Sequence, residues 1–302
     1  MLYMSIALEL YIFTASFSSG QAAGLTPILF KERSPMSLAP FAFVALPADR
    51  SSAKPRRRGL TMMIDNGLPT GFHRDLLETA GDYIDLAKFK TGTARLYRQD
   101  QLRRKLDQCA EHGVKAFIGG QFHEYVFAVY GPSALAEFYR EARRVGFATI
   151  EVSDNVVPLT LQQRRDQIRA AVDSGLEVFG EVGAKDRRST ATELIEQAGE
   201  SFEAGATLVL VEAAELVIDG QPNTAMLDEL SQQLDMARVM IELPGPWIPG
   251  VRTCDIEALK KLLVGTFGPD VNVANVSPDT VIDFEATRTG LGVAGPLGYH
   301  AA

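Results

Sequence analysis

The chain has 302 residues, of which 46% are hydrophobic and 23% are charged, and its formal net charge at pH 7 is −8. This composition is typical of a globular protein that folds as one large α/β domain or two smaller ones. The negative charge argues against a general surface for nucleic acids or anionic membranes. The two cysteines, Cys109 and Cys254, have no partner at metal-binding spacing and make no disulfide framework, which favours the cytoplasm.

Residues 1–45 form a predicted N-terminal extension. Its first part is apolar, but no basic segment precedes the apolar run, and Glu9 interrupts it. Both features are atypical of a secretory leader, and the run is too broken for a good transmembrane helix. We expect a disordered segment or a mispredicted start, with Met36 as an alternative first residue. A single domain then covers residues 46–302.

From residue 60 onward, short apolar runs alternate with longer amphipathic stretches. The runs are rich in Val, Ile, Leu and Phe, which is typical of buried strands. The eight predicted strands cover residues 60–65, 83–89, 114–120, 147–154, 177–183, 207–213, 239–244 and 271–276. The stretches between them are predicted helices, and two of these, residues 102–113 and 194–205, end on a glycine.

Eight strand–helix units over about 240 residues match the usual size of a (β/α)8 barrel. The competing architecture is an open doubly wound sheet, which normally has a glycine-rich dinucleotide turn after its first strand. Here the stretch IDNGLPTG follows the first strand and lacks the pattern G-x-G-x-x-G. The sequence therefore predicts an α/β fold, a single-domain (β/α)8 TIM barrel behind the N-terminal extension.

Acidic residues stand near the carboxyl ends of several predicted strands, where the loops of such barrels converge on one mouth. Four consecutive strands end near a glutamate (Glu151, Glu181, Glu212 and Glu242), and Asp65 ends the first strand. Crowded carboxylates repel one another unless a cation neutralises them, and hard oxygen ligands suit Mg²⁺. For any one glutamate, an ion pair or an outward orientation remains an equal alternative, because strand alternation does not fix the inner face.

Basic and polar residues accompany these carboxylates. Lys88, Lys90 and Lys185 also stand near strand ends, and a lysine beside a metal can deliver a proton or bind an anion. The alternative for each is a solvated loop lysine. The candidates for binding substrate are Lys90, Ser153, Arg58, Asn272 and Asn275.

Taken together, these strand ends resemble the phosphosulfolactate synthase family. The related segments occur in the family's order between residues 45 and 291, and their number and order make the resemblance specific although each alone is weak. They are KPRRRGLTMMIDNGL, AGDYIDLAKFKTGTA, HGVKAFIGGQFHE, GFATIEVSDN, EVGAKD, EAGATLVLVEA, IELPG and FGPDVNVANVSPDTVIDFEATRTGL.

The resemblance implies a (β/α)8 barrel that uses Mg²⁺ to add sulfite to phosphoenolpyruvate, giving 2-phospho-3-sulfolactate on the way to coenzyme M. Sulfite attacks C3, a metal stabilises the enediolate that builds on the carboxylate, and an acid protonates C2. By resemblance, Lys185 is that acid and Lys88 holds an anionic group. The residues that the resemblance implies as ligands or orienting groups of the metal, Glu181 being also a catalytic candidate, are Asp65, Glu151, Glu181, Glu212 and Glu242.

The chain departs from the family by losing basic residues. Ala213 follows Glu212 where the family has a Gly-Arg-Glu run, and residues 289–294 replace an arginine-rich run. Each lost cation removes a charge-assisted contact worth roughly 1.5–3 kcal/mol. The candidates to compensate are Arg56, Arg57, Arg58, Arg187, Arg188, Arg252 and Arg288.

Two further hypotheses therefore stand beside sulfite addition. One is an enzyme on the same scaffold with another nucleophile or a less charged substrate. The other is a barrel without catalysis that serves in stress responses, because plant relatives of the family are associated with heat-stress tolerance. Whether the chain forms a homo-oligomer is left open.

Overall fold

The computed structural model describes residues 40–41, 43–44, 46, 50, 53–183, 188–212, 216–218, 221–245, 248 and 250–291. The chain divides into two units, Met1–Ala45 and Leu46–Ala302. All the described helices and strands belong to the second unit. The predicted extension over residues 1–45 lies almost entirely outside the described residues. Among the described residues, every helix is too short or too polar to span a lipid bilayer.

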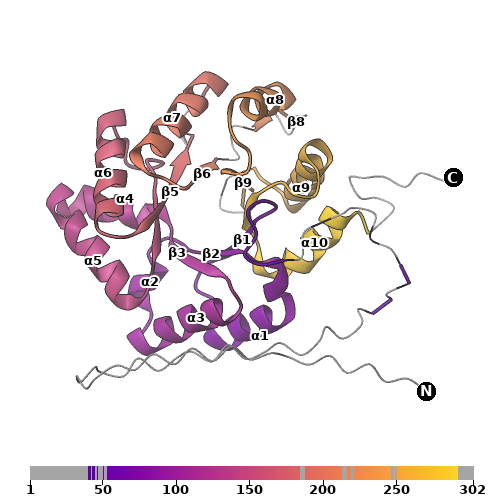
Figure 1. The fold of residues 1–302 in the computed structure, drawn as a ribbon, viewed down its shortest axis with the longest axis horizontal. Helices are drawn as coiled ribbons and strands as arrows, with labels where there is room; N and C mark the ends of the chain where they lie inside the picture. The colour runs from indigo at the N-terminus through magenta and orange to yellow at the C-terminus, as the bar shows by residue number, and fades with distance from the viewer. Residues whose placement is uncertain are drawn as a thin grey trace, which may run out of the picture. The chain divides into compact units, whose positions relative to one another are not determined.

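Eight parallel strands close into a barrel, which confirms the predicted architecture (Figure 1). Around the barrel their order is β1-β10-β9-β6-β5-β4-β3-β2. The strands are β1 Thr61–Asp65, β2 Leu86–Phe89, β3 Lys115–Ile118, β4 Thr149–Val152, β5 Glu177–Val182, β6 Leu208–Val211, β9 Val239–Glu242 and β10 Val273–Val276. A separate antiparallel hairpin follows β6 and consists of β7 Val217–Ile218 and β8 Gln221–Pro222.

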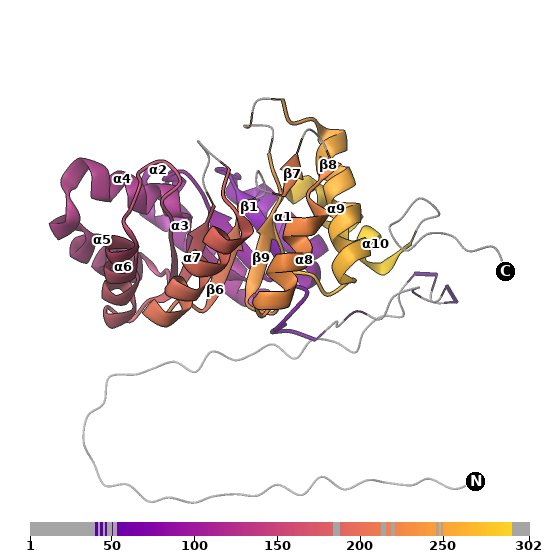
Figure 2. The ribbon, with the colours of Figure 1, turned by 90° about the horizontal axis from the view of Figure 1, so that it is seen from above.

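Helices surround the barrel and cover the outer face of its strands (Figures 1 and 2). They are α1 Thr70–Ala80, α2 Thr93–Leu96, α3 Gln99–Glu111, α4 Gly120–Tyr130, α5 Leu135–Val145, α6 Leu161–Asp173, α7 Ala191–Ala204, α8 Thr224–Gln233, α9 Thr253–Phe267 and α10 Val281–Thr289. The helices predicted from residues 102–113 and 194–205 correspond to α3 and α7. As predicted, α7 stops at a left-handed glycine, Gly205, with φ 114°.

Side chains alternate along each strand between the barrel interior and the surrounding helices. An apolar layer inside the barrel consists of Met62, Leu86, Phe117, Phe179, Leu208, Leu210, Met240 and Ala274. Two positions after Leu86, Phe179 and Met240 come Lys88, Glu181 and Glu242, which share the inward face of their strands. The alternation therefore carries charged side chains into the barrel at its carboxyl end, directly above an apolar floor.

Candidate active site

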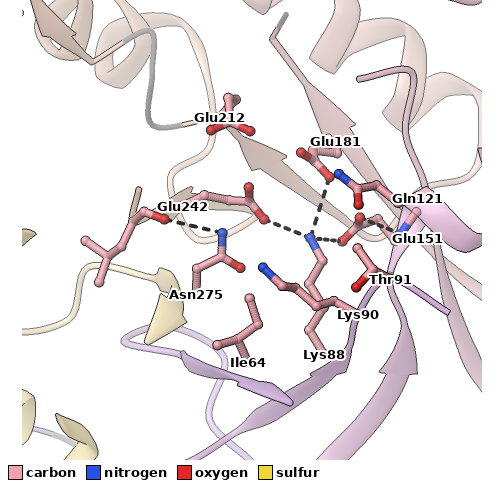
Figure 3. A pocket seen from close by; sticks show the side chains of 13 residues that line it. Ile64, Lys88, Lys90, Thr91, Gln121, Glu151, Glu181, Glu212, Glu242 and Asn275 are labelled. Atoms are coloured by element: carbon pink, nitrogen blue, oxygen red, sulfur yellow. Dashed lines mark hydrogen bonds and ion pairs between the residues drawn. The ribbon is translucent and has the colours of Figure 1, made fainter. Parts of the chain in front are cut away.

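A cavity of about 340 Å³ opens at the carboxyl ends of the strands (Figure 3). Each of the eight barrel strands, or the loop directly after it, contributes to its wall. Its charged and polar lining residues are Lys88, Lys90, Thr91, Gln121, Glu151, Glu181, Glu212, Glu242 and Asn275. The four predicted glutamates therefore face one cavity, and the outward orientation considered from the sequence is excluded for each of them.

Lys88 lies at the centre of three glutamates, Glu151, Glu181 and Glu242, which we call the glutamate cluster. Its Nζ is 2.8 Å from Oε2 of Glu151, 2.9 Å from Oε1 of Glu242 and 3.5 Å from Oε2 of Glu181. All four side chains are buried, and Figure 3 shows the three carboxylates pointing at the ammonium group. One ammonium group cannot neutralise three carboxylates, so the cluster has an excess of acidic groups.

Burial and charge shift the pKa values in this cluster. Burial raises the pKa of Glu151 well above 4.5, and the neighbouring glutamates add to this effect while Lys88 opposes it. Burial together with Glu181 raises the pKa of Glu242 to about 7, again against the effect of Lys88. Burial lowers the pKa of Lys88, but the three carboxylates outweigh burial and hold it well above 10.5. The lysine is therefore a permanent cation, while Glu151 and Glu242 resist ionisation.

The glycines after β3 allow the chain to approach the cluster closely. The backbone N–H of Gly120, the first residue of α4, donates a hydrogen bond of 2.7 Å to Oε1 of Glu151. A Cβ atom at Gly120 would collide with the side chain of Ser153 and lie 2.8 Å from Oε1 of Glu151. Only glycine therefore fits here, and the start of α4 places its partial positive charge beside a buried carboxylate.

The loop after β4 is fixed by buried carboxylates on neighbouring elements. The hydroxyl of Ser153 donates to Oε1 of Glu124 on α4, whose Oε2 accepts the backbone N–H groups of Val156 (2.7 Å) and Val157 (2.8 Å). The Asn155 amide donates to Oε1 of Glu181. Ser153 is buried beside the cavity but does not line it, so its predicted contact with substrate gives way to a role in holding this loop.

Asp65 is buried behind β1 and lies outside the cavity lining, contrary to its predicted place among the metal ligands. Its Oδ2 pairs with Nζ of Lys105 on α3 at 2.5 Å, and its Oδ1 accepts the backbone N–H groups of Gly67 and Leu68. In β1 the inward residue is Ile64, so the next residue faces the helices. Asp65 therefore anchors the loop after β1 to α3.

Arg58 and Asn272 were predicted to bind substrate, and the structure places both at the opposite end of the barrel. Arg58 precedes β1, is largely exposed, and pairs with Asp270 at 3.1 Å. Asn272 precedes β10 and is buried; its Oδ1 accepts the Leu60 N–H at 2.8 Å. Its Nδ2 lies 3.0–3.1 Å from the carbonyl oxygens of residues 236, 237 and 239. Asn272 therefore ties β1, β9 and β10 together far from the mouth.

Replacing Asn272 with alanine is expected to lower the free energy of unfolding by about 2 kcal/mol, because buried backbone groups lose their partner. Urea denaturation measures this loss. Below the unfolding transition, the variant should keep the wild-type kcat and KM, since the side chain is remote from the cavity. A selective loss of activity without a loss of stability would contradict this reading.

The predicted candidates Lys90 and Asn275 do line the cavity. Asn275 adopts a left-handed backbone conformation, with φ 58°, and its Nδ2 donates to the Leu243 carbonyl at 3.4 Å. Its Oδ1 is buried and has no hydrogen-bond partner among the described residues, so one acceptor lies beside the cluster. Lys185, the predicted acid, lies outside the described residues.

Four of the arginines considered as substitutes for the missing family cations have other roles, and one of them is Arg58 with its ion pair to Asp270. Arg56 pairs with Asp85 at 2.9 Å, and Arg252 pairs with Asp255 at 2.9 Å. Arg288 is fully buried and donates to the carbonyl oxygens of residues 269 and 271. Lys88 and Lys90 are the basic residues among the described residues that line the cavity.

Three polar residues of the site were missed as site candidates: Thr91 and Gln121 in the cavity wall, and Asn155 on Glu181. Gln121 directly follows the glycine pair after β3, which was a usable signal. Asn155 does not cap the next helix, because Thr160 caps α6. Thr91 has a left-handed backbone conformation, with φ 44°, and the sequence carries no signal for it.

Comparison with known proteins gives a family match and several relatives. The model of the (2R)-phospho-3-sulfolactate synthase (ComA) family matches residues 49–293. A phosphosulfolactate synthase of Methanocaldococcus jannaschii is 32% identical over 246 residues, which cover 78% of this chain and 92% of that protein. A phosphosulfolactate synthase of Bacillus subtilis is 32% identical over 250 residues, which cover 79% and 92%.

A more distant relative, the Protein HEAT-STRESS-ASSOCIATED 32 of Arabidopsis thaliana, is 24% identical over 253 residues, covering 78% of this chain and 87% of that protein. The family match spans nearly the whole described barrel. The two synthases align with this chain over most of their own length. These matches confirm both the predicted family and the predicted enzyme class, a carbon–sulfur synthase. The chain belongs to the phosphosulfolactate synthase family.

Proposed function

We propose that the protein is a Mg²⁺-dependent enzyme that adds sulfite to phosphoenolpyruvate and forms 2-phospho-3-sulfolactate. The observation that carries the proposal is the glutamate cluster, which gathers three buried carboxylates at the mouth of a barrel of this family. Small anionic substrates need a cation to enter a cavity with so many acidic groups. A divalent metal supplies that charge.

The glutamate cluster fits a hard divalent cation. Carboxylate oxygens of Glu151, Glu181 and Glu242 lie within 4.8 Å of one another. Mg²⁺ prefers oxygen ligands, so these three carboxylates are the groups that would hold it. The described lining contains no histidine or cysteine that would favour zinc. When bound, the metal stabilises the negative charge that develops on the substrate during attack.

The chain's own residues bind the substrate and move the proton. Lys88 balances the carboxylates and, with Lys90, orients the anionic substrate. Bisulfite releases its proton as its sulfur bonds to C3 of phosphoenolpyruvate, and C2 takes a proton from Lys185. The released proton restores the Lys185 ammonium group through solvent, so the addition involves no net change in protons. The apolar layer below the cavity closes it to water from the far side of the barrel.

The test is a ³¹P NMR assay of phosphoenolpyruvate consumption with and without sulfite, with mass spectrometry of the product. We expect phosphoenolpyruvate to be consumed only when both sulfite and Mg²⁺ are present. EDTA should abolish this consumption, and the Lys185→Ala variant should not show it. Consumption of phosphoenolpyruvate without sulfite would refute sulfite addition while leaving the metal site in place.

A second candidate function is favoured by one observation: the described cavity wall has two basic residues, Lys88 and Lys90, against four glutamates. A substrate with fewer negative charges, or another nucleophile, would suit this balance. The same assay separates the two candidates when other nucleophiles replace sulfite. A barrel without catalysis, as the name of the plant relative allows, instead predicts no Mg²⁺ binding by calorimetry and no effect of Lys185→Ala.

A further inference from the structure

A second cavity, of about 330 Å³, opens at the opposite end of the barrel. Its lining includes the first residues of β2, β5 and β6, namely Leu86, Glu177 and Leu208. It therefore lies at the amino ends of the strands, whereas the glutamate cluster lies at their carboxyl ends. We call it the basal pocket.

The floor of the basal pocket is apolar. Leu86, Phe179 and Leu208 belong to the apolar layer inside the barrel, and Leu60 packs against that layer at the rim. The ring of Phe179 also meets the ring of Phe117 edge to face, with centroids 5.0 Å apart. The floor is thus a preformed surface against which an apolar or aromatic body can pack.

The wall of the basal pocket carries more positive than negative charge. Four basic residues line it against two carboxylates. Two of the basic residues are neutralised, because Arg56 pairs with Asp85 at 2.9 Å and Lys115 pairs with Glu177 at 2.6 Å. The basal pocket therefore keeps an excess of two positive charges on a chain whose net charge is −8.

The two excess charges belong to Arg57 and Arg238. Arg238 donates to the carbonyl oxygens of Ala206 (3.0 Å) and Thr207 (3.4 Å), and its guanidinium lies 4.0 Å from the centroid of the Phe202 ring. None of these partners carries a negative charge, so the positive charge of Arg238 remains. Arg57 is exposed, and within the described part of the chain it has no ion pair or side-chain hydrogen bond. Barrel residues at the amino end usually serve stability, but an unpaired arginine over an apolar floor adds nothing to stability.

We propose that the basal pocket binds a small organic anion with an apolar body, whose charged group meets Arg57 and Arg238 and whose body packs on Phe179 and Leu208. The combination of an exposed guanidinium with an apolar floor selects this class of ligand over a bare inorganic ion, which would leave the floor uncovered. This site is separate from the proposed reaction and does not depend on it.

The test uses the full chain in buffer with Mg²⁺ and an aromatic sulfonate dye, 8-anilinonaphthalene-1-sulfonate, as the probe. We expect saturable binding by fluorescence and calorimetry that Arg57→Gln weakens about tenfold, because a charge-assisted contact is lost. Ala237→Glu should weaken binding further, because it places a carboxylate on the exposed rim without removing any side-chain partner.

The matched control is Arg58→Gln, which removes the same charge at the same end of the barrel from a residue that does not line the basal pocket. Wild type and this control should bind the dye equally, and inorganic phosphate should compete poorly. Equal affinity in all four proteins would place the dye elsewhere, such as the apolar cavity beside Phe122 and Phe138, and would overturn the proposal. Phosphate that competes as well as an aromatic carboxylate would also overturn it.

Discussion

Replacing Lys88 with methionine is expected to destabilise the metal-free protein by about 3–5 kcal/mol near neutral pH. The substitution keeps most of the apolar stem but removes the ammonium group that contacts Glu151, Glu181 and Glu242. Three buried carboxylates would then face one another with no cation among them. They must either take up protons or repel one another, and both outcomes lower the free energy of unfolding.

Urea denaturation in EDTA measures this loss, and a repeat with saturating Mg²⁺ separates charge from packing. If a divalent cation binds the glutamate cluster, Mg²⁺ should stabilise Lys88→Met more than it stabilises wild type, because the metal no longer competes with an ammonium group. Synthase activity should still be lost, since the anionic substrate loses its buried cation.

The matched control is Lys90→Met, which removes a partly exposed lysine from the wall of the same cavity. This change should cost less than about 1 kcal/mol of stability, as is usual for charges that water screens. Equal destabilisation by the two substitutions, or no response of Lys88→Met to Mg²⁺, would show that the cluster does not work as a cation site.

The sequence predicted the barrel and the glutamates for the same reason. In the barrel strands β5, β6 and β9, an apolar inward residue stands two positions before the glutamate, as in Phe179 with Glu181 and Met240 with Glu242. Strand ends of a parallel barrel share one mouth, so four glutamates at four ends had to meet if they faced inward. The alternation of inward and outward side chains along a strand is a local pattern, and local patterns can be read from the sequence.

The prediction that Asp65 lies among the metal ligands does not match the structure. Both faces of a barrel strand are apolar, so the sequence does not show which residues face inward. In β1 the inward residue is Ile64, one position before the strand ends, and the aspartate therefore points at α3. The failures of Arg58 and Asn272 have a different cause. Both precede their strands, and residues before a parallel strand lie at the amino end of the barrel. Chain direction alone would have separated them from the mouth.

The contacts that complete the site could not be predicted from sequence, because they join residues far apart in the chain. Lys88 and Glu242 are 154 positions apart, and their 2.9 Å contact depends on closure of the whole barrel. The hydrogen bond from Asn155 to Glu181 depends on the pairing of β4 with β5. A single sequence shows the residue types but not these distances.

The stability of the metal-free protein should fall as pH rises through about 7, and Glu242→Gln should remove much of that fall. Burial raises the pKa of Glu242 to about 7 in the folded protein, compared with 4.5 in the unfolded chain. The folded state therefore binds a proton more tightly than the unfolded state does. The resulting stability is fully present below about pH 4.5 and is lost as pH rises through about 7.

The expected size of this effect is about 3 kcal/mol between about pH 5 and pH 8, measured as the difference in unfolding free energy between wild type and Glu242→Gln. The difference is the right quantity because two buried histidines act in the opposite direction. Burial lowers the pKa values of His73 and His123, so each adds stability as pH rises toward 6.5. Both histidines are present in wild type and variant, and their contributions cancel.

Glu137→Gln, which removes an exposed carboxylate on α5, is the matched control and should follow the wild-type pH profile. Saturating Mg²⁺ should flatten the wild-type profile above about pH 7, because a bound cation replaces the proton that Glu242 otherwise holds. Parallel profiles for wild type and Glu242→Gln in EDTA would mean that Glu242 is ionised throughout. The cluster would then be an ion-pair network balanced by Lys88, and the case for a metal at this mouth would lose its electrostatic basis.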